Sequence, residues 1–416
     1  MKKISICLVS FLFISLVLSS CLKDECELKR TFYRYDPIYV SKQQIIDGFK
    51  ISGAKSIEET GKIYNFKQYL FINEPKKGIH IIDNTLPKSP IAISFIAIPG
   101  NVDMAVRDGI LYADNYMDML AIDITNPTLP KLSCRVENVF EPIMTDPVRG
   151  LLVDYAKTEQ TQILSCTEAN FNRDIFFEGD VIFSSTDTKN QNNRSFTGLT
   201  GIGGSLARFT IVDDYLYTVD QTNLFSFNIS ATCPKLSNKS VIGWNIETIY
   251  PYGGNLFIGS TSGMFIYTLT NPGMPVFASQ LQHWSSCDPV VVEGDVAYVT
   301  LHGGTSCGGF TNQLDIIDVK NIYSPILLKT YPMSYPLGLS VYNNTLYLCD
   351  DGLKIYNVSD WKNIQLQSHV PIVDTYDVIL LSESHLILVG SKGLYQYDVT
   401  LKNKPELLSL LSVTGK

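Results

Sequence analysis

The sequence lacks the short motifs that mark most hydrolases, and it has few residues suited to proton transfer. It contains neither a GxSxG segment nor an HExxH segment, which argues against an α/β-hydrolase nucleophile and a zinc-protease helix. Only five histidines occur in 416 residues, so candidates for a general base are few. The formal net charge is −8 and there is no basic stripe, which argues against a nucleic-acid partner.

The N-terminus has the composition of an export signal. A basic start, "MKK", precedes the apolar run "ISICLVSFLFISLVL", and "SSC" closes the segment at Cys21. This order predicts a signal peptide over residues 1–20. The stretch "LVLSSC" resembles a bacterial lipobox, in which the cysteine is acylated and begins the mature chain; an uncleaved signal-anchor helix is the alternative. No later run approaches 18 consecutive apolar residues, so no second membrane span is expected.

The residues after Cys21 bear on where the protein is delivered. Lys23, Asp24 and Glu25 are similar to the surface-export signal of Bacteroidetes lipoproteins. We therefore expect an outer-membrane lipoprotein, exposed on the cell surface if this signal is read. Loss of Lys2 and Lys3 with the leader lowers the formal charge to −10.

Export also permits disulfides. Seven cysteines remain when Cys7 and the acylated Cys21 are set aside, and this odd number leaves at least one thiol free or paired between chains. They are Cys26, Cys134, Cys166, Cys233, Cys287, Cys307 and Cys349.

One short pattern recurs along almost the whole chain. Lines such as "GIHIIDNTLPKSP", "MLAIDITNPTLP" and "LDIIDVKNIYSP" each join alternating apolar residues to Asp or Asn and a Pro-containing turn. Seven such lines begin about 40 residues apart, except for one interval of 105 and one of 49. A second strand precedes each line, a third follows it and an inner strand leads the set. Four short strands per repeat predict an all-β fold, a β-propeller of four-stranded blades.

The long interval decides how many blades are expected. It has room for two repeats, and "RGLLVDYAKTEQTQILSC" reads as a degenerate hairpin, so eight blades are favoured. Seven blades, with this region as an excursion, are the alternative. Residues 21–61 are expected to form a lipidated tether and capping segment, in which "SKQQIIDGF" forms a short helix. Residues 62–416 are expected to form a single propeller domain with an insertion near residues 158–204.

The three quoted lines resemble LVIVD repeats, which occur in cell-envelope lipoproteins of bacteria. The likeness extends over roughly residues 62–416. It implies a β-propeller, export and a role that the family does not define. The repeat specifies no catalytic residue, so none is assigned to this chain.

Alignment of the repeats predicts a ring of polar residues at the starts of the inner strands. These positions hold Lys62, Asp103, Arg208, Glu247, Asp288, Gly338 and Asp377, with Glu141 or Asp146 as candidates for the third blade. The loops between second and third strands add Asp114, Asn115, Asp220, Asp350 and Asp351 at the same end. The candidate binding funnel, taken with a nearby histidine, comprises Asp103, Arg208, Glu247, Asp288, His302 and Asp377.

Two interpretations of this ring remain open. Carboxylates around a channel are suited to Ca²⁺ or to a basic partner, and two of them suit a glycan hydrolase or lyase. Alternatively, each Asp accepts hydrogen bonds from backbone amides at its own strand and is structural. We favour a binding or scaffold module with an unknown protein or glycan partner, no cofactor and no catalytic residues. The Gly-rich "GIGGS" precedes a strand rather than a helix, which argues against a phosphate loop.

The segment "HWSSCDPVVVEGDVAYVTLHGGTSCGGF" combines two cysteines with two histidines. The repeat register places Cys287 roughly opposite His302, and Cys307 lies in a Gly-rich loop that can fold back toward it. A Cys287–Cys307 disulfide is therefore predicted. A zinc site that adds His283 and His302 is a weaker alternative because the spacing is not that of a CxxC clamp. Free or otherwise paired thiols are the third alternative.

Overall fold

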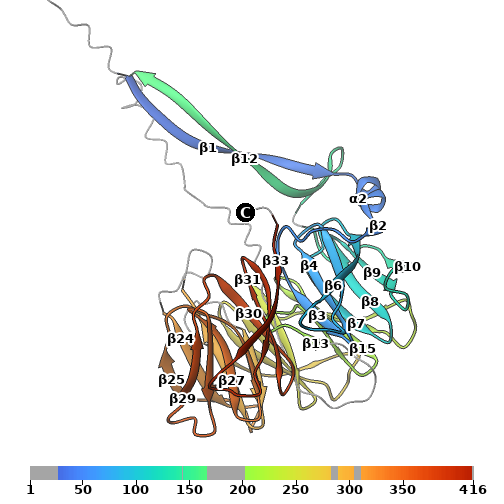
Figure 1. Ribbon diagram of the computed structural model, residues 1–416. Helices are drawn as coiled ribbons and strands as arrows, with labels where there is room; N and C mark the ends of the chain where they lie inside the picture. The colour runs from blue at the N-terminus through green and yellow to red at the C-terminus, as the bar shows by residue number, and fades with distance from the viewer. Residues whose placement is uncertain (1–26, 143, 166–201, 283–288, 304–310, 415–416) are drawn as a thin grey trace, which may run out of the picture. The chain divides into compact units, whose positions relative to one another are not determined.

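The computed structural model describes residues 27–142, 144–165, 202–282, 289–303 and 311–414. It confirms an all-β propeller (Figure 1). The first three blades, from the inner strand outward, are β3 (Ile63–Phe66), β4 (Tyr69–Glu74), β5 (Gly78–Asp83), β6 (Ile91–Ala97); β7 (Met104–Arg107), β8 (Ile110–Asn115), β9 (Asp118–Asp123), β10 (Lys131–Val136); and β14 (Phe209–Val212), β15 (Tyr215–Val219), β16 (Asn223–Asn228), β17 (Lys235–Val241).

The remaining four blades follow without interruption along the chain. They are β18 (Ile246–Tyr252), β19 (Asn255–Ser260), β20 (Gly263–Thr268), β21 (Val276–Gln282); β22 (Val290–Glu293), β23 (Val296–Leu301), β24 (Gln313–Asp318), β25 (Ile326–Pro332); β26 (Pro336–Tyr342), β27 (Thr345–Asp350), β28 (Leu353–Asn357), β29 (Gln365–Val370); and β30 (Thr375–Ser382), β31 (His385–Gly390), β32 (Gly393–Asp398), β33 (Glu406–Ser412). We number these sheets blades 1 to 7 in chain order.

The repeated Asp or Asn of each line is a turn residue. It ends the third strand, and its side chain accepts a hydrogen bond from the backbone amide two residues later, as in Asp83 to Thr85, Asp123 to Thr125 and Asp398 to Thr400, each at 2.8 Å. This Asx turn redirects the chain into the outer strand. The second and third strands are buried on both faces because neighbouring blades pack against each side.

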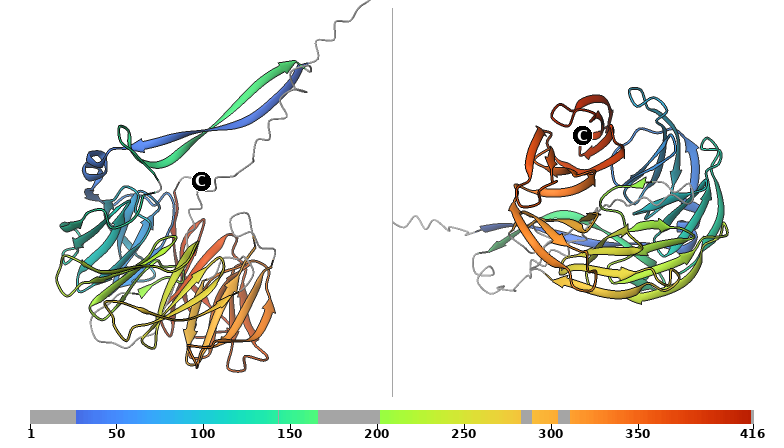
Figure 2. Two further views of the ribbon diagram at one scale, coloured as in Figure 1. Left: turned by 180° about the vertical axis from the view of Figure 1, so that it is seen from behind. Right: turned by 90° about the horizontal axis from the view of Figure 1, so that it is seen from below.

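A hydrogen bond between neighbouring blades repeats around the ring. A serine in the outer strand donates to a carbonyl in the turn of the next blade: Ser94 to Pro127 at 2.7 Å, Ser279 to Ile322 at 2.5 Å and Ser368 to Lys402 at 2.8 Å. Ser409 of blade 7 donates in the same way to Pro87 of blade 1, at 2.6 Å. The last blade therefore meets the first as successive blades meet, and the ring closes after seven (Figure 2).

The closure between blades 1 and 7 is otherwise made by side chains. Ile63, Leu70 and Ile72 of blade 1 form one buried cluster with residues of blade 7 that include Ile379, Ile387 and Val389. Asn84 and Gln396 exchange two hydrogen bonds across the same seam, of 3.0 and 2.8 Å. Apolar burial thus joins the ends of the ring without a strand shared between the two blades.

The described residues form eight sheets, but the one in the place of the expected third blade is not a blade. It has three strands, β1 (Glu27–Val40), β12 (Gly150–Ser165) and β11 (Thr145–Asp146). Residues 150–165 of the segment read as a degenerate hairpin form the single strand β12, which pairs with β1. Polar residues occupy both faces of its 158–162 part, so it does not suit a strand packed between two blades. The expectation of eight blades is corrected to the seven-blade alternative.

The long ribbon and the propeller are separate compact units. The ribbon consists of described residues 27–39 and 153–165, and the described remainder belongs to the propeller unit. The expected helix is confirmed as α2 (Lys42–Gly48), whose N-cap Ser41 forms a capping box with Gln44. After it, β2 (Lys50–Gly53) pairs with β6 at the outer edge of blade 1. No helix in the described ranges is long and apolar enough to cross a membrane.

Candidate functional site

The described members of the predicted ring do lie at the starts of inner strands. Lys62, Asp103 and Arg208 immediately precede β3, β7 and β14. Glu247, Gly338 and Asp377 lie within the first three residues of β18, β26 and β30. The side chains of Lys62, Asp103, Glu247 and Asp377 are buried. Asp288 lies outside the described residues.

The two third-blade candidates lie elsewhere. Glu141 pairs with Lys239 of blade 3, and its side chain is exposed. Asp146 belongs to β11 and pairs with Arg149 at 2.8 Å. Because the ribbon takes the place of the expected third blade, neither carboxylate is at the start of an inner strand.

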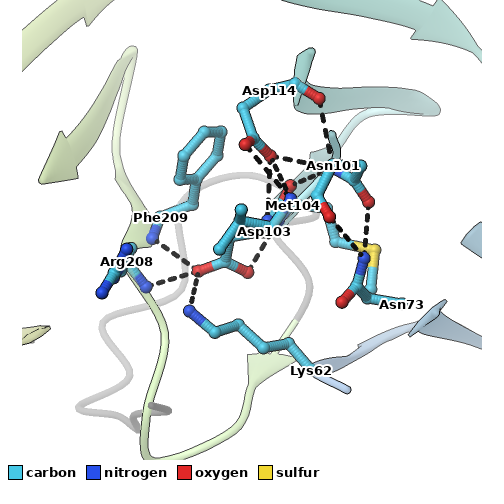
Figure 3. Close-up of polar contacts among 9 residues, drawn as sticks. Lys62, Asn73, Asn101, Asp103, Met104, Asp114, Arg208 and Phe209 are labelled. Atoms are coloured by element: carbon cyan, nitrogen blue, oxygen red, sulfur yellow. Dashed lines mark hydrogen bonds and ion pairs between the residues drawn. The ribbon is translucent and has the colours of Figure 1, made fainter. Parts of the chain in front are cut away.

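Asp103 is the centre of the best-defined polar cluster (Figure 3). One carboxylate oxygen, Oδ2, accepts from the backbone amides of Arg208 and Phe209 at the start of blade 3, and it lies 3.5 Å from Lys62 Nζ. The other oxygen, Oδ1, accepts from the amide of Met104 at 2.7 Å. Lys62 and Asp103 have side-chain exposures of only 2% and 3%. This carboxylate joins blades 1, 2 and 3, and these contacts favour the structural interpretation.

Asp114, at the end of the second strand of blade 2, supports the same chain segment. Its Oδ1 accepts from the amides of Val102 and Asp103, both at 2.9 Å, and from Asn101 Nδ2 at 2.8 Å. Asn101 in turn accepts from Asn73 of blade 1 at 2.7 Å. The repeat alignment identified Asp114 but missed Asn73, at the corresponding position of β4, and Asn101, in the loop before β7.

Titration of Asp114 should make stability depend on pH. Burial raises the pKa of Asp114 to about 6, well above the usual range of an aspartate. The folded protein therefore holds this proton more tightly than the unfolded chain, and stability should fall as pH rises from about 4 to about 6. Asp114→Asn does not titrate. Relative to wild type, the variant should gain on the order of 1–3 kcal/mol between pH 4 and 7, measured by denaturant unfolding. An equal effect from Asp108→Asn, at an exposed site, would contradict this.

A short segment from residue 202 to residue 209 runs through the centre of the ring. β13 (Ile202–Gly203) pairs with β3 on the inner side of blade 1, and the right-hand view of Figure 2 shows it inside the ring. Ser205 Oγ lies 2.6 Å from Asp377 Oδ1 of blade 7 and accepts from the amide of Leu339 of blade 6 at 2.9 Å. The carbonyl of Ala207 accepts from the amide of Ile249 of blade 4 at 3.0 Å. This central segment therefore ties together blades that are far apart in the sequence.

Two glycines lie where the central segment packs closely against Asp377. A Cβ added at Gly204 would lie 2.1 Å from Asp377 Oδ2, and one added at Gly338 would lie 2.4 Å from Asp377 Oδ1. Gly338, the ring position without a side chain, is thus where Ser205 and Asp377 approach closely. Gly204 of "GIGGS" therefore permits close packing inside the ring.

His302 lies at the end of the second strand of blade 5. Its ring is 5.2 Å from that of Tyr335, edge to face, and burial lowers the pKa of His302 to about 4. The imidazole is therefore neutral at physiological pH. Cys287 and Cys307 lie outside the described residues, as do His283 and Asp288, so the predicted disulfide, the zinc alternative and the contact of His302 with Cys287 are left as predictions.

Another buried acid–base pair was missed by the sequence analysis. His80 Nε2 lies 2.8 Å from Glu74 Oε2, and both side chains are buried in blade 1. Burial lowers the pKa of His80, opposed in part by its contact with Glu74. Lys77 contacts the other oxygen of Glu74 at 2.6 Å. The side chains of His80 and Glu74 are only 1% and 5% exposed, and we assign this pair to the blade interior.

The structure contains a disulfide between Cys134 in the outer strand of blade 2 and Cys233 in the turn of blade 3. Their Cα atoms are 5.3 Å apart, and 99 positions separate them in sequence. Cys134 stands four residues after the turn proline, as do Ser94, Ser279 and Ser409 in their blades. The disulfide therefore replaces the serine hydrogen bond between neighbouring blades. Alignment of the outer strands places Cys134 at the serine position, but only the structure shows that this position contacts the turn of the next blade.

Reduction of this disulfide should destabilise the propeller measurably. Because the closed loop is about 100 residues long, loss of the cross-link is expected to cost about 2–5 kcal/mol. Thermal unfolding with and without dithiothreitol should show this as a lower Tm. The control is the Cys134→Ser/Cys233→Ser variant, whose Tm should respond little to reductant. A response as large as that of wild type would assign the effect to other cysteines.

Metal binding was a candidate function of the ring. Within the described ranges, no group of three or more His, Cys, Asp or Glu side chains is arranged to hold a metal ion. Binding of Ca²⁺ at the funnel therefore stays an expectation.

Comparisons with known proteins support the architecture. No family model matches the chain, and no curated protein matches it. A functionally unknown protein from Desulfotomaculum acetoxidans is 13% identical over 84% of this chain and 98% of its own, with a TM-score of 0.51. The periplasmic gluconolactonase PpgL of Pseudomonas aeruginosa is 9% identical over 85% of this chain and 96% of its own, also with a TM-score of 0.51.

A third solved structure is a bacterial surface protein. PorZ of the type-IX secretion system of Porphyromonas gingivalis is 12% identical over 86% of this chain, with a TM-score of 0.47. This chain spans only 39% of PorZ. At these identities, the two likenesses with a TM-score of 0.51 show the fold alone. Together with the seven blades, they make this chain a β-propeller.

Proposed function

We propose that this protein is an exported lipoprotein whose β-propeller serves as a binding or scaffold module at the cell envelope. The signal peptide of residues 1–20 is removed, and Cys21 carries the lipid. The segment Lys23–Glu25 directs the protein to the outer membrane and its exterior. We assign the repeats to the LVIVD type and the partner to a protein or a glycan, not a nucleic acid.

The observation that carries this proposal is that the ring carboxylates already form hydrogen bonds within the protein. Asp103 accepts hydrogen bonds from three backbone amides, and Asp377 contacts the central segment through Ser205. A glycosidase acid and base must both reach the scissile bond. Buried carboxylates whose oxygens contact the backbone support a structural role, and binding is then assigned to exposed loops.

Exposed loops at one end of the ring offer a surface for a partner. Trp244, Tyr335 and Val373 lie in connections from an outer strand to the next inner strand, and all three are exposed. In a propeller these connections share one end of the ring. Trp244, at 78% exposure, is the strongest single candidate, since exposed aromatic residues are enriched in interface hot spots.

Cross-linking on intact cells tests the proposal. The wild-type lipoprotein should capture a specific partner, and Trp244→Ala/Tyr335→Ala should lose most of it. The control is Tyr323→Ala, because Tyr323 is exposed at 65% in a turn between third and fourth strands, at the other end of the ring. Mass spectrometry should find the acyl group on Cys21.

An enzymatic role is the outcome that would overturn the proposal. Wild-type protein should show no turnover on a panel of glycans and aldonolactones. Turnover that Glu247→Gln or Asp288→Asn abolishes, while the fold is retained, would replace the binding module with an enzyme that uses ring carboxylates.

A further inference from the structure

The ribbon exposes apolar surface of its own. β1 and β12 pair along the ribbon (Figure 1). Their exposed side chains include Tyr33, Tyr35, Ile38 and Ile163. A two-stranded ribbon is at best marginally stable in water by itself. Contact with another surface would stabilise it.

One face of the ribbon combines aromatic rings with a cation. Lys157 Nζ of β12 lies 4.0 Å from the ring centroid of Tyr33 and 5.8 Å from that of Tyr35, both on β1. Side chains two residues apart point to the same face of a strand, so Lys29 and Thr31 share this face with the tyrosines. Thr161 Oγ1, 3.4 Å from Thr31 Oγ1, extends it along β12.

The same alternation completes the face and defines the opposite one. Ile163, 62% exposed, follows Thr161 by two residues and belongs to the tyrosine face. The same face also carries Lys29, Lys157 and Glu159. Arg34 and Asp36 lie on the other face, where they form an ion pair with a distance of 2.9 Å. The tyrosine face is thus amphipathic, with exposed aromatic and aliphatic side chains beside the Lys157 ammonium.

The ribbon begins only a few residues after Cys21, the proposed site of the lipid anchor. Only residues 22–26 separate Cys21 from the first residue of β1, Glu27. Five residues span at most about 18 Å when extended. We propose that the tyrosine face docks on the phospholipid headgroups of the membrane that holds the anchor, an inference that rests on the acylation in the proposed function. Tyrosine rings and long lysine side chains suit this boundary, since each has an apolar body and a polar tip.

The alternative occupant of the tyrosine face is the ribbon of a second copy of the chain. Pro37 removes one backbone donor from β1, and a proline or charged residue on an edge strand disfavours strand addition. Docking on a membrane requires no strand pairing at the edge of the ribbon, because the tyrosine face makes the contact. The anchor also holds the ribbon beside the bilayer, so even weak headgroup binding is populated.

Vesicle binding without the lipid anchor tests the inference. The mature-length chain with Cys21→Ser is mixed with phosphatidylethanolamine/phosphatidylglycerol vesicles and sedimented. It should bind weakly, and Tyr33→Ser/Tyr35→Ser should lower the partition coefficient at least about tenfold. Tyr323→Ser, a matched change at an exposed tyrosine of the propeller, should leave it unchanged. Tyr33→Phe/Tyr35→Phe should retain most of the binding, because the rings remain.

Three outcomes would overturn the inference. They are no vesicle binding by the Cys21→Ser chain, equal binding by the double serine variant, and a dimer that depends on the two tyrosines in sedimentation without lipid. If the double serine variant loses the ribbon strands, amide exchange in the acylated wild-type protein replaces it as the test. Residues 29–40 should exchange more slowly in nanodiscs than in detergent. Unchanged exchange would overturn the inference. Acylation itself is read separately by mass spectrometry, so failure of the anchor and failure of the docking face are distinguishable.

Discussion

Replacing Asp103 with leucine is expected to destabilise the propeller by about 3–5 kcal/mol. The change removes the carboxylate that faces the buried Lys62 ammonium and that accepts the amides of Met104, Arg208 and Phe209. Buried donors that lose an acceptor incur their full desolvation cost. Denaturant unfolding should show a lower midpoint, because three blades meet at this side chain.

Two further variants separate the charge from the hydrogen bonds. Asp103→Asn keeps an acceptor oxygen and should cost less than leucine. Adding Lys62→Met to Asp103→Leu should recover part of the loss, because the buried ammonium is removed as well. If Asp103→Leu costs under about 1 kcal/mol, the cluster is not a structural junction and a ligand-binding role for the ring regains support.

Gly338→Ala is expected to have the second large effect. The added Cβ would lie 2.4 Å from Asp377 Oδ1, 2.6 Å from Ser205 Oγ and 2.7 Å from the backbone carbonyl of Tyr376. The two side chains are held by hydrogen bonds and the third atom is backbone, so the strain has no easy relief. Overpacking of this kind costs about 1–3 kcal/mol or more, and release of Ser205 should also loosen the central segment. Thermal unfolding and amide exchange of residues 203–209 measure the two effects.

Gly53→Ala supplies the matched control. Gly53 lies at the end of β2, and an added Cβ there would meet no atom within 4 Å. Its Tm should stay within a degree or two of wild type. Equal losses at both positions would mean that close packing at the centre of the ring is not the cause.

The repeat made most of the fold predictable. Each four-stranded blade is a local unit, and its apolar alternation, its Asx turn and its proline all lie within about 40 residues. The starts of the inner strands followed from the same register, so Asp103 and Asp377 were placed correctly without coordinates. A short-range sequence pattern is sufficient to predict strand pairing wherever the paired strands lie within one repeat.

The errors occurred where a segment pairs outside its own repeat. The region of β12 was interpreted as a degenerate hairpin within a blade, but it forms one strand whose partner β1 lies more than 100 residues earlier. The segment "GIGGS" has a local appearance of a loop, and its contacts with Asp377 and Leu339 are more than 130 residues away. No periodicity in the chain encodes such pairings.

By itself, the sequence determined the strands, the turns and the strand starts, because each is specified by residues that are neighbours along the chain. Only the tertiary structure decided that seven blades close the ring, that a central segment lies inside it, and that Cys134 pairs with Cys233. These depend on which distant surfaces bury one another. Burial is a property of the folded whole, and a local pattern does not contain it.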